Sequence, residues 1–155
     1  MSSHTIFVPK SNSTAIPANE FYWTFGSNPE VTAERSLFYL FTYLPTGEQF
    51  WSILGAIGSI SSGNYFAYNM SFPYIDGAPL KATYTLKDKL SFSHGSSIPA
   101  PEGFEGWRVV KADEATLTID LDPAKGTAVG TFEAKFKSHG FRTQPIGHFN
   151  LVISE

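Results

Sequence analysis

Two runs of alternating apolar and polar residues, joined by a turn sequence, make Ala115–Phe136 the segment that most constrains the fold. Alternation with a period of two is typical of a β-strand that buries one face. The joining sequence Asp122-Pro123-Ala124-Lys125-Gly126 favours a tight turn. In such a turn Asp bonds back to the backbone, Pro fixes φ and Gly permits positive φ at the exit. The segment therefore predicts an antiparallel β-hairpin.

Similar short runs recur along the chain and predict further strands. Neither face of the Ser36–Leu44 run is polar, so we expect other parts of the protein or a partner subunit to cover both faces. Glu48–Gly63 is open to two interpretations, because its apolar spacing suits a short helix and its glycines suit a strand bent at a barrel corner. The other runs are Thr5–Val8, Phe21–Phe25, Tyr65–Phe72, Lys81–Leu86, Leu90–Ser93, Trp107–Lys111, Gly140–Gln144 and Gly147–Ile153.

Short strands linked by polar turns predict an all-β protein, and 155 residues suit a single domain over residues 1–155. The connections are short, and glycines fall inside strands, where sheets curl. We therefore expect a single antiparallel β-barrel of about eight strands. A two-sheet β-sandwich is the alternative.

The composition excludes several functional classes. The chain has no cysteine, which rules out a disulfide scaffold, a cysteine-ligated zinc site and a thiol nucleophile. Its net charge is −3 and it has no basic stripe, so we expect no nucleic-acid partner. The apolar run Phe50–Ile60 is shorter than the ~20 residues that cross a bilayer, and we expect no membrane span. The N-terminus lacks the pattern of a secretory signal, which favours a cytoplasmic location.

Aromatic residues are concentrated in the first half of the chain. Residues 1–80 hold 16 of the 24 aromatics but 7 of the 25 charged residues. Tyr and Trp combine an apolar ring with a polar group, as the walls of small-molecule sites do. These rings could also fill the core, or seal a homodimer through the Ser36–Leu44 region. The candidate ligand-binding residues are Trp23, Tyr39, Tyr43, Trp51, Tyr65, Tyr68, Tyr84 and Trp107.

Other chemical signals are weak. The Gly-rich run Gly55–Gly63 is followed by Asn64 and Tyr65, not by the Lys and Ser/Thr of a phosphate-binding loop. No histidine has a nearby carboxylate in the pattern of a metal site, so we expect neither a metal nor a cofactor. The four histidines are interpreted as turn or strand residues: His4, His94, His139 and His148. Four charged residues of the aromatic half are acid–base candidates if they face a cavity: Glu20, Glu34, Arg35 and Glu48.

The run Gly58–Leu86 resembles part of the small lipocalin-like barrels of the allene oxide cyclase type. The resemblance rests on Ser61-Ser62-Gly63-Asn64-Tyr65 followed by strand, turn and strand. That family includes cofactor-free cyclases of bacterial natural-product pathways. The resemblance implies a barrel with an apolar cavity and assigns no catalytic residue.

These observations lead to three functional hypotheses. The first is binding of a small hydrophobic or aromatic molecule in an aromatic-lined barrel cavity. The loop Ser96–Gly106 could be a flap over its mouth or a plain connector, and the connector is the more common case. The second is a cofactor-free isomerase or cyclase that acts in the same cavity. The third is a homo-oligomeric interaction or structural protein.

Overall fold

The computed structural model describes residues 19–138 and 140–154, so the strand predicted at Thr5–Val8 lies outside the described residues. The described chain is all-β, and its one helical element is a single 3₁₀ turn. Within this range no helix has the length and apolar character needed to cross a membrane. The elements are β1 (Glu20–Phe25), β2 (Val31–Thr32), β3 (Arg35–Tyr43), β4 (Glu48–Ile57), β5 (Phe66–Pro73), β6 (Leu80–Thr85), η1 (Leu86–Asp88), β7 (Ser91–Ile98), β8 (Gly106–Lys111), β9 (Glu114–Asp122), β10 (Thr127–Lys135) and β11 (Pro145–Val152).

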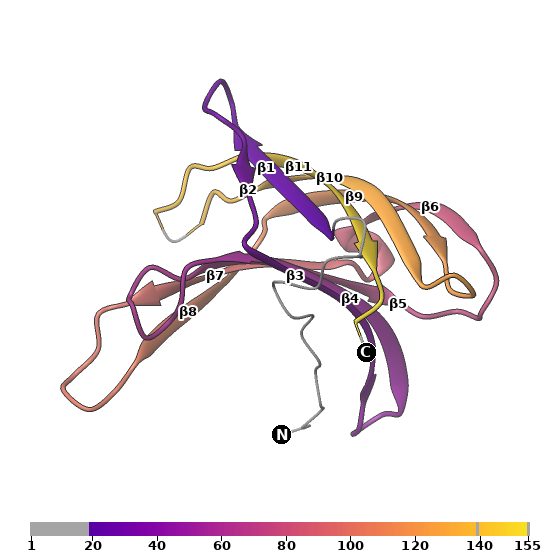
Figure 1. The fold of residues 1–155 in the computed structure, drawn as a ribbon, viewed down its shortest axis with the longest axis horizontal. Helices are drawn as coiled ribbons and strands as arrows, with labels where there is room; N and C mark the ends of the chain where they lie inside the picture. Colours follow the sequence, from indigo (N-terminus) through magenta and orange to yellow (C-terminus); the bar gives the residue numbers. More distant parts are fainter. Residues whose placement is uncertain (1–18, 139, 155) are drawn as a thin grey trace.

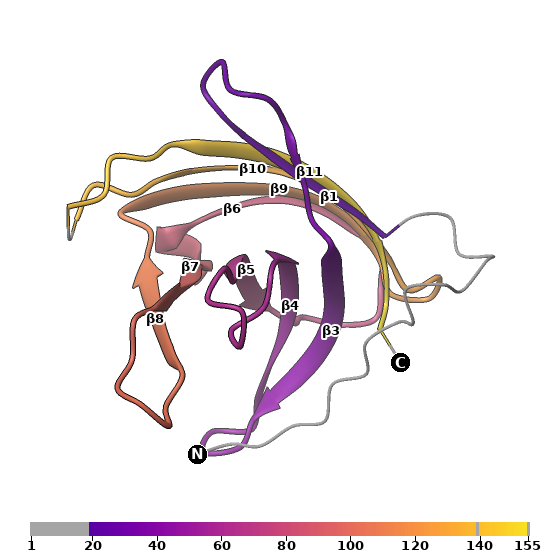
Figure 2. The same cartoon turned by 60° about the vertical axis from the view of Figure 1, so that its left-hand side comes forward.

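The strands form two antiparallel sheets that face each other (Figures 1 and 2). Sheet A has the order β2-β1-β11-β10-β9-β6, and sheet B has the order β3-β4-β5-β7-β8. The chain passes from one sheet to the other four times, between β2 and β3, β5 and β6, β6 and β7, and β8 and β9. No pairing between the described strands closes the two sheets into one barrel, so the sandwich alternative fits as well as a barrel.

The predicted hairpin is confirmed as β9 and β10. Leu117 lies opposite Phe132 in its register, which places two apolar side chains on the same face. At the turn the Lys125 N–H donates to the Asp122 carboxylate over 3.2 Å, and Gly126 has a φ of 67°. The turn therefore forms through the Asp122 hydrogen bond and the positive φ of Gly126 that the sequence predicts.

The strand and loop boundaries of sheet B differ more from those that the sequence predicts. Glu48–Ile57 is a strand and not a helix, and it ends at Gly58, whose φ is 68°. Strand β7 runs on to Ile98, so the predicted loop Ser96–Gly106 shrinks to residues 99–105.

In sheet A, the prediction of a strand at Gly140–Gln144 is wrong. Thr143 makes only an isolated bridge to Phe136. The neighbouring carbonyls of Lys137 and Phe141 accept hydrogen bonds from the Arg142 guanidinium, which holds the segment as a loop.

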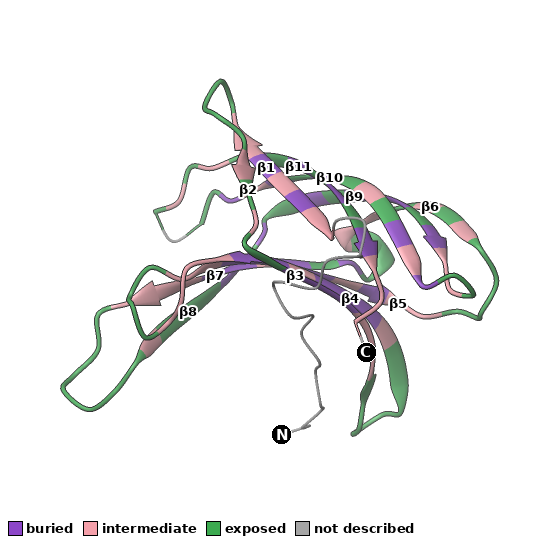
Figure 3. Ribbon diagram, viewed as in Figure 1, coloured by how far each residue is buried: buried purple, intermediate pink, exposed green. Residues whose placement is uncertain are grey.

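The core lies between the sheets and is built from their facing side chains (Figure 3). At its centre the Phe21 ring is 5.3 Å from the Phe132 ring and 5.9 Å from the Phe149 ring. Burial of such rings supplies most of the driving force for folding. On β3, the successive residues Leu37 and Phe38 are both buried, but Tyr43 and Leu44 are exposed, so the predicted cover on both faces holds only for the first part of the run.

Candidate functional site

The eight predicted ligand-binding residues do not surround one cavity. Trp23, Trp51 and Tyr68 are buried in the core. Tyr84 stacks on the core residue Phe72, with ring centroids 5.1 Å apart. The other four lie at or beyond the second face of sheet B, which points away from sheet A: these are Tyr39, Tyr43, Tyr65 and Trp107. The structure therefore divides the set into core rings and outer-face rings.

A different aromatic cluster surrounds a histidine at one end of the core. We call His94, Phe66, Phe136 and Phe141 the His94 box. The imidazole centroid of His94 is 5.5 Å from the Phe66 ring, 4.6 Å from the Phe136 ring and 4.7 Å from the Phe141 ring. Two of the predicted residues adjoin the box, because Trp23 and Tyr68 both pack against Phe66. The box thus joins part of the predicted set to a titratable group.

His94 is 3 % exposed, and its Nδ1 atom has no hydrogen-bond partner among the described residues. A buried polar atom left without a partner costs about 1–3 kcal/mol. The phenyl rings around the imidazole cannot supply that partner. Burial lowers the pKa of His94 below its ordinary value, because the charged imidazolium loses its hydration. The side chain is therefore a neutral imidazole at pH 7, with one unused hydrogen-bonding site.

Several elements position the box. His94 lies opposite Tyr68 of β5 and Val110 of β8, in the middle of sheet B. Phe66 begins β5, and Phe136 follows β10. Phe141 is half-buried and belongs to the loop between β10 and β11. Three walls of the box thus come from strands or their ends, and one comes from a loop.

That loop is fixed to the sheets by two side chains. The Asp113 carboxylate accepts hydrogen bonds from the N–H groups of Lys137 and Ser138, over 2.6 and 3.1 Å. Hydrogen bonds from the Ser138 hydroxyl and the Lys137 N–H hold the pKa of Asp113 below its usual range. The Arg142 Nη1 donates to the carbonyls of Lys137 and Phe141, each over 2.9 Å. The position of Phe141 therefore depends on Asp113 and Arg142.

A surface hollow of about 590 Å³ lies beside this loop. It is open to solvent and is lined by Phe25, Gly26, Asn28 and residues 142–144, which directly follow Phe141 in the chain. Phe25 continues the core-facing row of β1 and packs against the buried cluster. Hollows of this size are typical of small-molecule sites. The hollow thus gives solvent access at the loop that carries Phe141.

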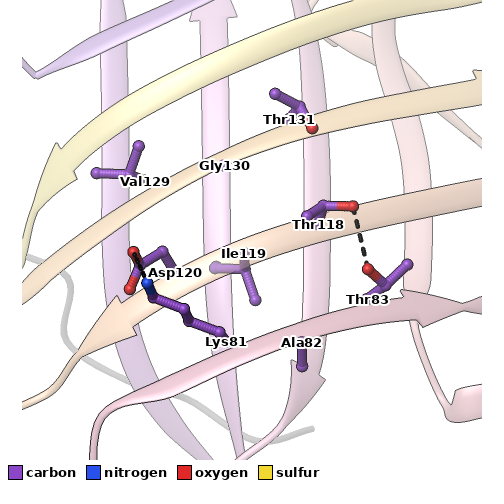
Figure 4. A pocket seen from close by; sticks show the side chains of 9 residues that line it. All are labelled: Lys81, Ala82, Thr83, Thr118, Ile119, Asp120, Val129, Gly130 and Thr131. Atoms are coloured by element: carbon purple, nitrogen blue, oxygen red, sulfur yellow. Dashed lines mark hydrogen bonds and ion pairs between the residues drawn. The ribbon is translucent and has the colours of Figure 1, made fainter.

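The outer face of sheet A is polar and offers a weaker candidate. A hollow of about 510 Å³ lies over β6, β9 and β10, and Figure 4 shows the side chains that line it. In it Lys81 pairs with Asp120 at 3.7 Å, and the hydroxyls of Thr83 and Thr118 are 3.2 Å apart. These four polar side chains pair with one another and are exposed to solvent, whereas the unpartnered nitrogen of His94 is buried.

The acid–base candidates do not converge on one place. The Glu34 carboxylate accepts the Gly58 N–H over 3.1 Å, and the Arg35 guanidinium donates to the Gly58 carbonyl. Both residues therefore hold the turn after β4. Glu48 is exposed at the β3–β4 hairpin. These contacts explain Glu34 and Arg35 as supports of a turn.

His148 is separate from the box. His148 lies on the outer face of sheet A, where its Nε2 is 3.2 Å from the Glu30 carboxylate and its ring stacks on Tyr22. His4 and His139 lie outside the described residues. In the part of the chain that the structure describes, no three His, Cys, Asp or Glu side chains are placed to hold a metal ion.

Sequence reasoning missed the box because it placed His94 at a turn. A signal was present, since Leu90, Phe92 and His94 alternate with polar residues and all three are buried. No protein-family model, no curated protein and no solved structure matches this chain. The candidate site therefore rests on its own geometry.

Proposed function

We propose that this protein binds a small, mostly apolar molecule that carries one hydrogen-bonding group, and that the His94 box is the site. One observation carries the proposal: the Nδ1 of His94 is buried and has no partner among the described residues. A ligand hydroxyl or carbonyl would supply the missing bond. The surrounding phenyl rings would hold its apolar body.

The protonation state of the His94 imidazole limits which polar group the ligand can carry. Because burial lowers the pKa of His94, the ring is neutral near pH 7 and does not act as a charge. A neutral imidazole nitrogen either accepts a hydrogen bond from a hydroxyl or donates one to a carbonyl, depending on its tautomer. A strongly charged ligand would lose its hydration in this apolar surrounding, so a neutral polar group fits best.

Phe141 is the wall that would move to admit the ligand. It is half-buried, it lies in a loop, and it touches the His94 ring edge-on at 4.7 Å. Phe136, by contrast, is buried, and its N–H donates to the Thr143 carbonyl over 2.9 Å. Entry from the adjacent hollow would require displacement of one ring, and the strands would stay in place.

The barrel interpretation is compatible with this site. The Ser154 N–H donates to the Phe38 carbonyl over 2.7 Å, which ties the end of β11 to the edge of sheet B. With the four chain segments that cross between the sheets, this contact supports a flattened, partly open barrel as the finer description of the fold. The resemblance of Gly58–Leu86 to lipocalin-like barrels supports binding of an apolar molecule in such a frame.

A pair of probe molecules tests the proposal. Phenol and toluene have similar size and shape, but only phenol can bond to Nδ1. We expect phenol to bind the wild-type protein roughly tenfold more tightly than toluene, from about 1.4 kcal/mol for one buried hydrogen bond. Tryptophan fluorescence would report binding, because Trp23 packs against Phe66 of the box.

Two variants give the matched comparison. His94→Phe keeps a ring but removes the nitrogen, and it should bind both probes with similar affinity. His148→Phe makes the same exchange on the outer face of sheet A and should retain the preference for phenol. Equal affinity of wild-type protein for the two probes, or loss of the preference in His148→Phe alone, would contradict the proposed site.

A further inference from the structure

Strand β8 is an edge of sheet B, and one row of its backbone groups faces away from the sheet (Figures 1 and 2). The Ala112 N–H donates to the Phe92 carbonyl over 2.8 Å, in the register that pairs β7 with β8. In an antiparallel pair, alternate residues bond to the same neighbour. Val110 and Arg108 therefore bond toward β7, and the N–H and C=O groups of Trp107, Val109 and Lys111 point outward.

The side chains of this edge are also unusual. Trp107 and Val109 are each 55 % exposed, although both are large apolar residues. Edge strands are commonly protected by charges, by Pro or by a covering segment, because their free backbone groups attract other strands. No backbone group within residues 19–138 and 140–154 bonds to the outward row of β8. The edge therefore combines unused hydrogen-bonding groups with an apolar surface.

We propose that β8 pairs antiparallel with β8 of a second copy of this chain, with the two-fold axis at Val109. The outward groups of Val109 and of the partner's Val109 would then bond to each other, and Trp107 would lie opposite the partner's Lys111. Three residue pairs of this kind supply about six hydrogen bonds. The two copies of sheet B would form one continuous sheet.

The side chains of β8 are self-complementary in this register. The Lys111 ammonium of each copy falls beside the indole of Trp107 in the other, an arrangement that favours a cation–π contact. The indole is already oriented, because it lies over Gly95 and meets the Tyr65 ring edge-on at 6.4 Å. The two Val109 side chains meet at the centre, and Arg108 faces the partner's Val110, so no like charges oppose each other.

The other sheet edges are less suitable. The β3 edge, where the sequence predicts a Ser36–Leu44 dimer, already accepts the Ser154 N–H at the Phe38 carbonyl. Strand β2 has two residues. On β6 the exposed residues are Lys81 and Thr83, which offer no apolar surface. Among the described strands, only β8 combines a free edge with exposed apolar side chains.

A single cysteine tests the register, because the natural chain contains none. Opposed residues in a hydrogen-bonded antiparallel pair have Cα atoms about 5.5 Å apart, which lies within the range that a disulfide bridges. Val109→Cys should therefore form a disulfide-linked dimer on mild oxidation. Val129→Cys is the control, since Val129 is 47 % exposed on β10 in the interior of sheet A.

A second variant tests the backbone hydrogen bonds of the proposed dimer. Val109→Pro removes an outward N–H but none of the bonds to β7, so it should keep the wild-type unfolding transition. In sedimentation experiments the wild-type protein should have twice the chain mass of 17.1 kDa, and Val109→Pro should have the single-chain mass. A monomeric wild-type protein, equal cross-linking of both cysteine variants, or a dimer that survives Val109→Pro would overturn the proposal.

Discussion

The imidazole of His94 stacks on the phenyl ring of Phe66, with centroids 5.5 Å apart and planes inclined by 22°. Stacking covers a face of the imidazole, whereas a hydrogen bond to Nδ1 must lie in the ring plane. A polar partner therefore has to approach from the side, among the edges of the neighbouring phenyl rings. The same contact that buries His94 thus fixes the direction from which a ligand would bind.

The first prediction concerns the pH dependence of stability. Burial lowers the pKa of folded His94, while the unfolded chain keeps a value near 6.5. Well above pH 6.5, where His94 is neutral in both states, it contributes no pH dependence. As the pH falls below 6.5, the unfolded chain takes up a proton that the folded protein excludes, and the free energy of unfolding decreases.

Denaturant titrations at several pH values measure this effect against His94→Phe. The difference in unfolding free energy between wild type and variant should be constant above pH 6.5. Below it, the wild type should lose stability relative to the variant, by up to about 1.4 kcal/mol per pH unit. Parallel pH profiles for the two proteins would show that His94 titrates normally and is not excluded from solvent.

The second prediction concerns Phe141. Phe141→Ala removes a ring that contacts His94 and leaves an apolar gap of similar size. Apolar gaps of this kind stay dry and bind small aromatic molecules. We expect Phe141→Ala to bind phenol and toluene more tightly than wild type, with phenol still preferred. Phe104→Ala, at an exposed ring in the β7–β8 loop, should leave both affinities unchanged.

The third prediction concerns the anchor of the loop that carries Phe141. Asp113→Asn replaces one acceptor oxygen by an amide nitrogen and weakens the bonds to the N–H groups of Lys137 and Ser138. Hydrogen exchange at these two amides should become faster. Asp88→Asn is the control, because Asp88 accepts comparable hydrogen bonds from Thr85 and is far in sequence from residues 137 and 138. Unchanged exchange at residues 137 and 138 would show that Asp113 does not hold the loop.

The fourth prediction concerns the packing between the sheets. A Cβ atom at Gly55 would lie 2.3–2.6 Å from the ring atoms of Phe21, which is at the centre of the core. Gly55→Ala should therefore lower the free energy of unfolding by about 1–3 kcal/mol, as overpacked cores do. Gly77→Ala is the control, because no atom lies within 4 Å of the position that its new methyl group would take. Equal stability of the two variants in urea would mean that Phe21 moves aside easily.

Local patterns made part of the fold predictable. The β9–β10 hairpin depends on alternation within each strand and on a turn between Asp122 and Gly126, and all of these features are neighbours in sequence. The strand at Ser36–Leu44 was also predictable from a local feature, its short run of apolar and aromatic residues. The segment at Gly140–Gln144 was not, because its conformation depends on bonds from Arg142 to the carbonyls of Lys137 and Phe141.

The candidate site was less predictable, because long-range pairing decides which face of a strand is buried. Tyr65 and Tyr68 are three residues apart, so they point to opposite faces, but the sequence does not say which face meets sheet A. Strand β7 is rich in serine and lacks a strong apolar pattern. Its Gly95 is explained only by the Trp107 indole that lies over it from β8. The position of His94 depends on such pairings.

The most direct test of the account is an NMR measurement of the side-chain nitrogen atoms of His94 during titration with phenol. The account predicts that the Nδ1 resonance, assigned by its loss in His94→Phe, shifts with phenol until the site is saturated, and that toluene leaves it nearly unchanged. It also predicts that the resonances of His148 do not respond. Binding of phenol without a shift at His94, or an equal shift with toluene, would contradict the claim that the unused nitrogen of His94 is the polar contact of the site.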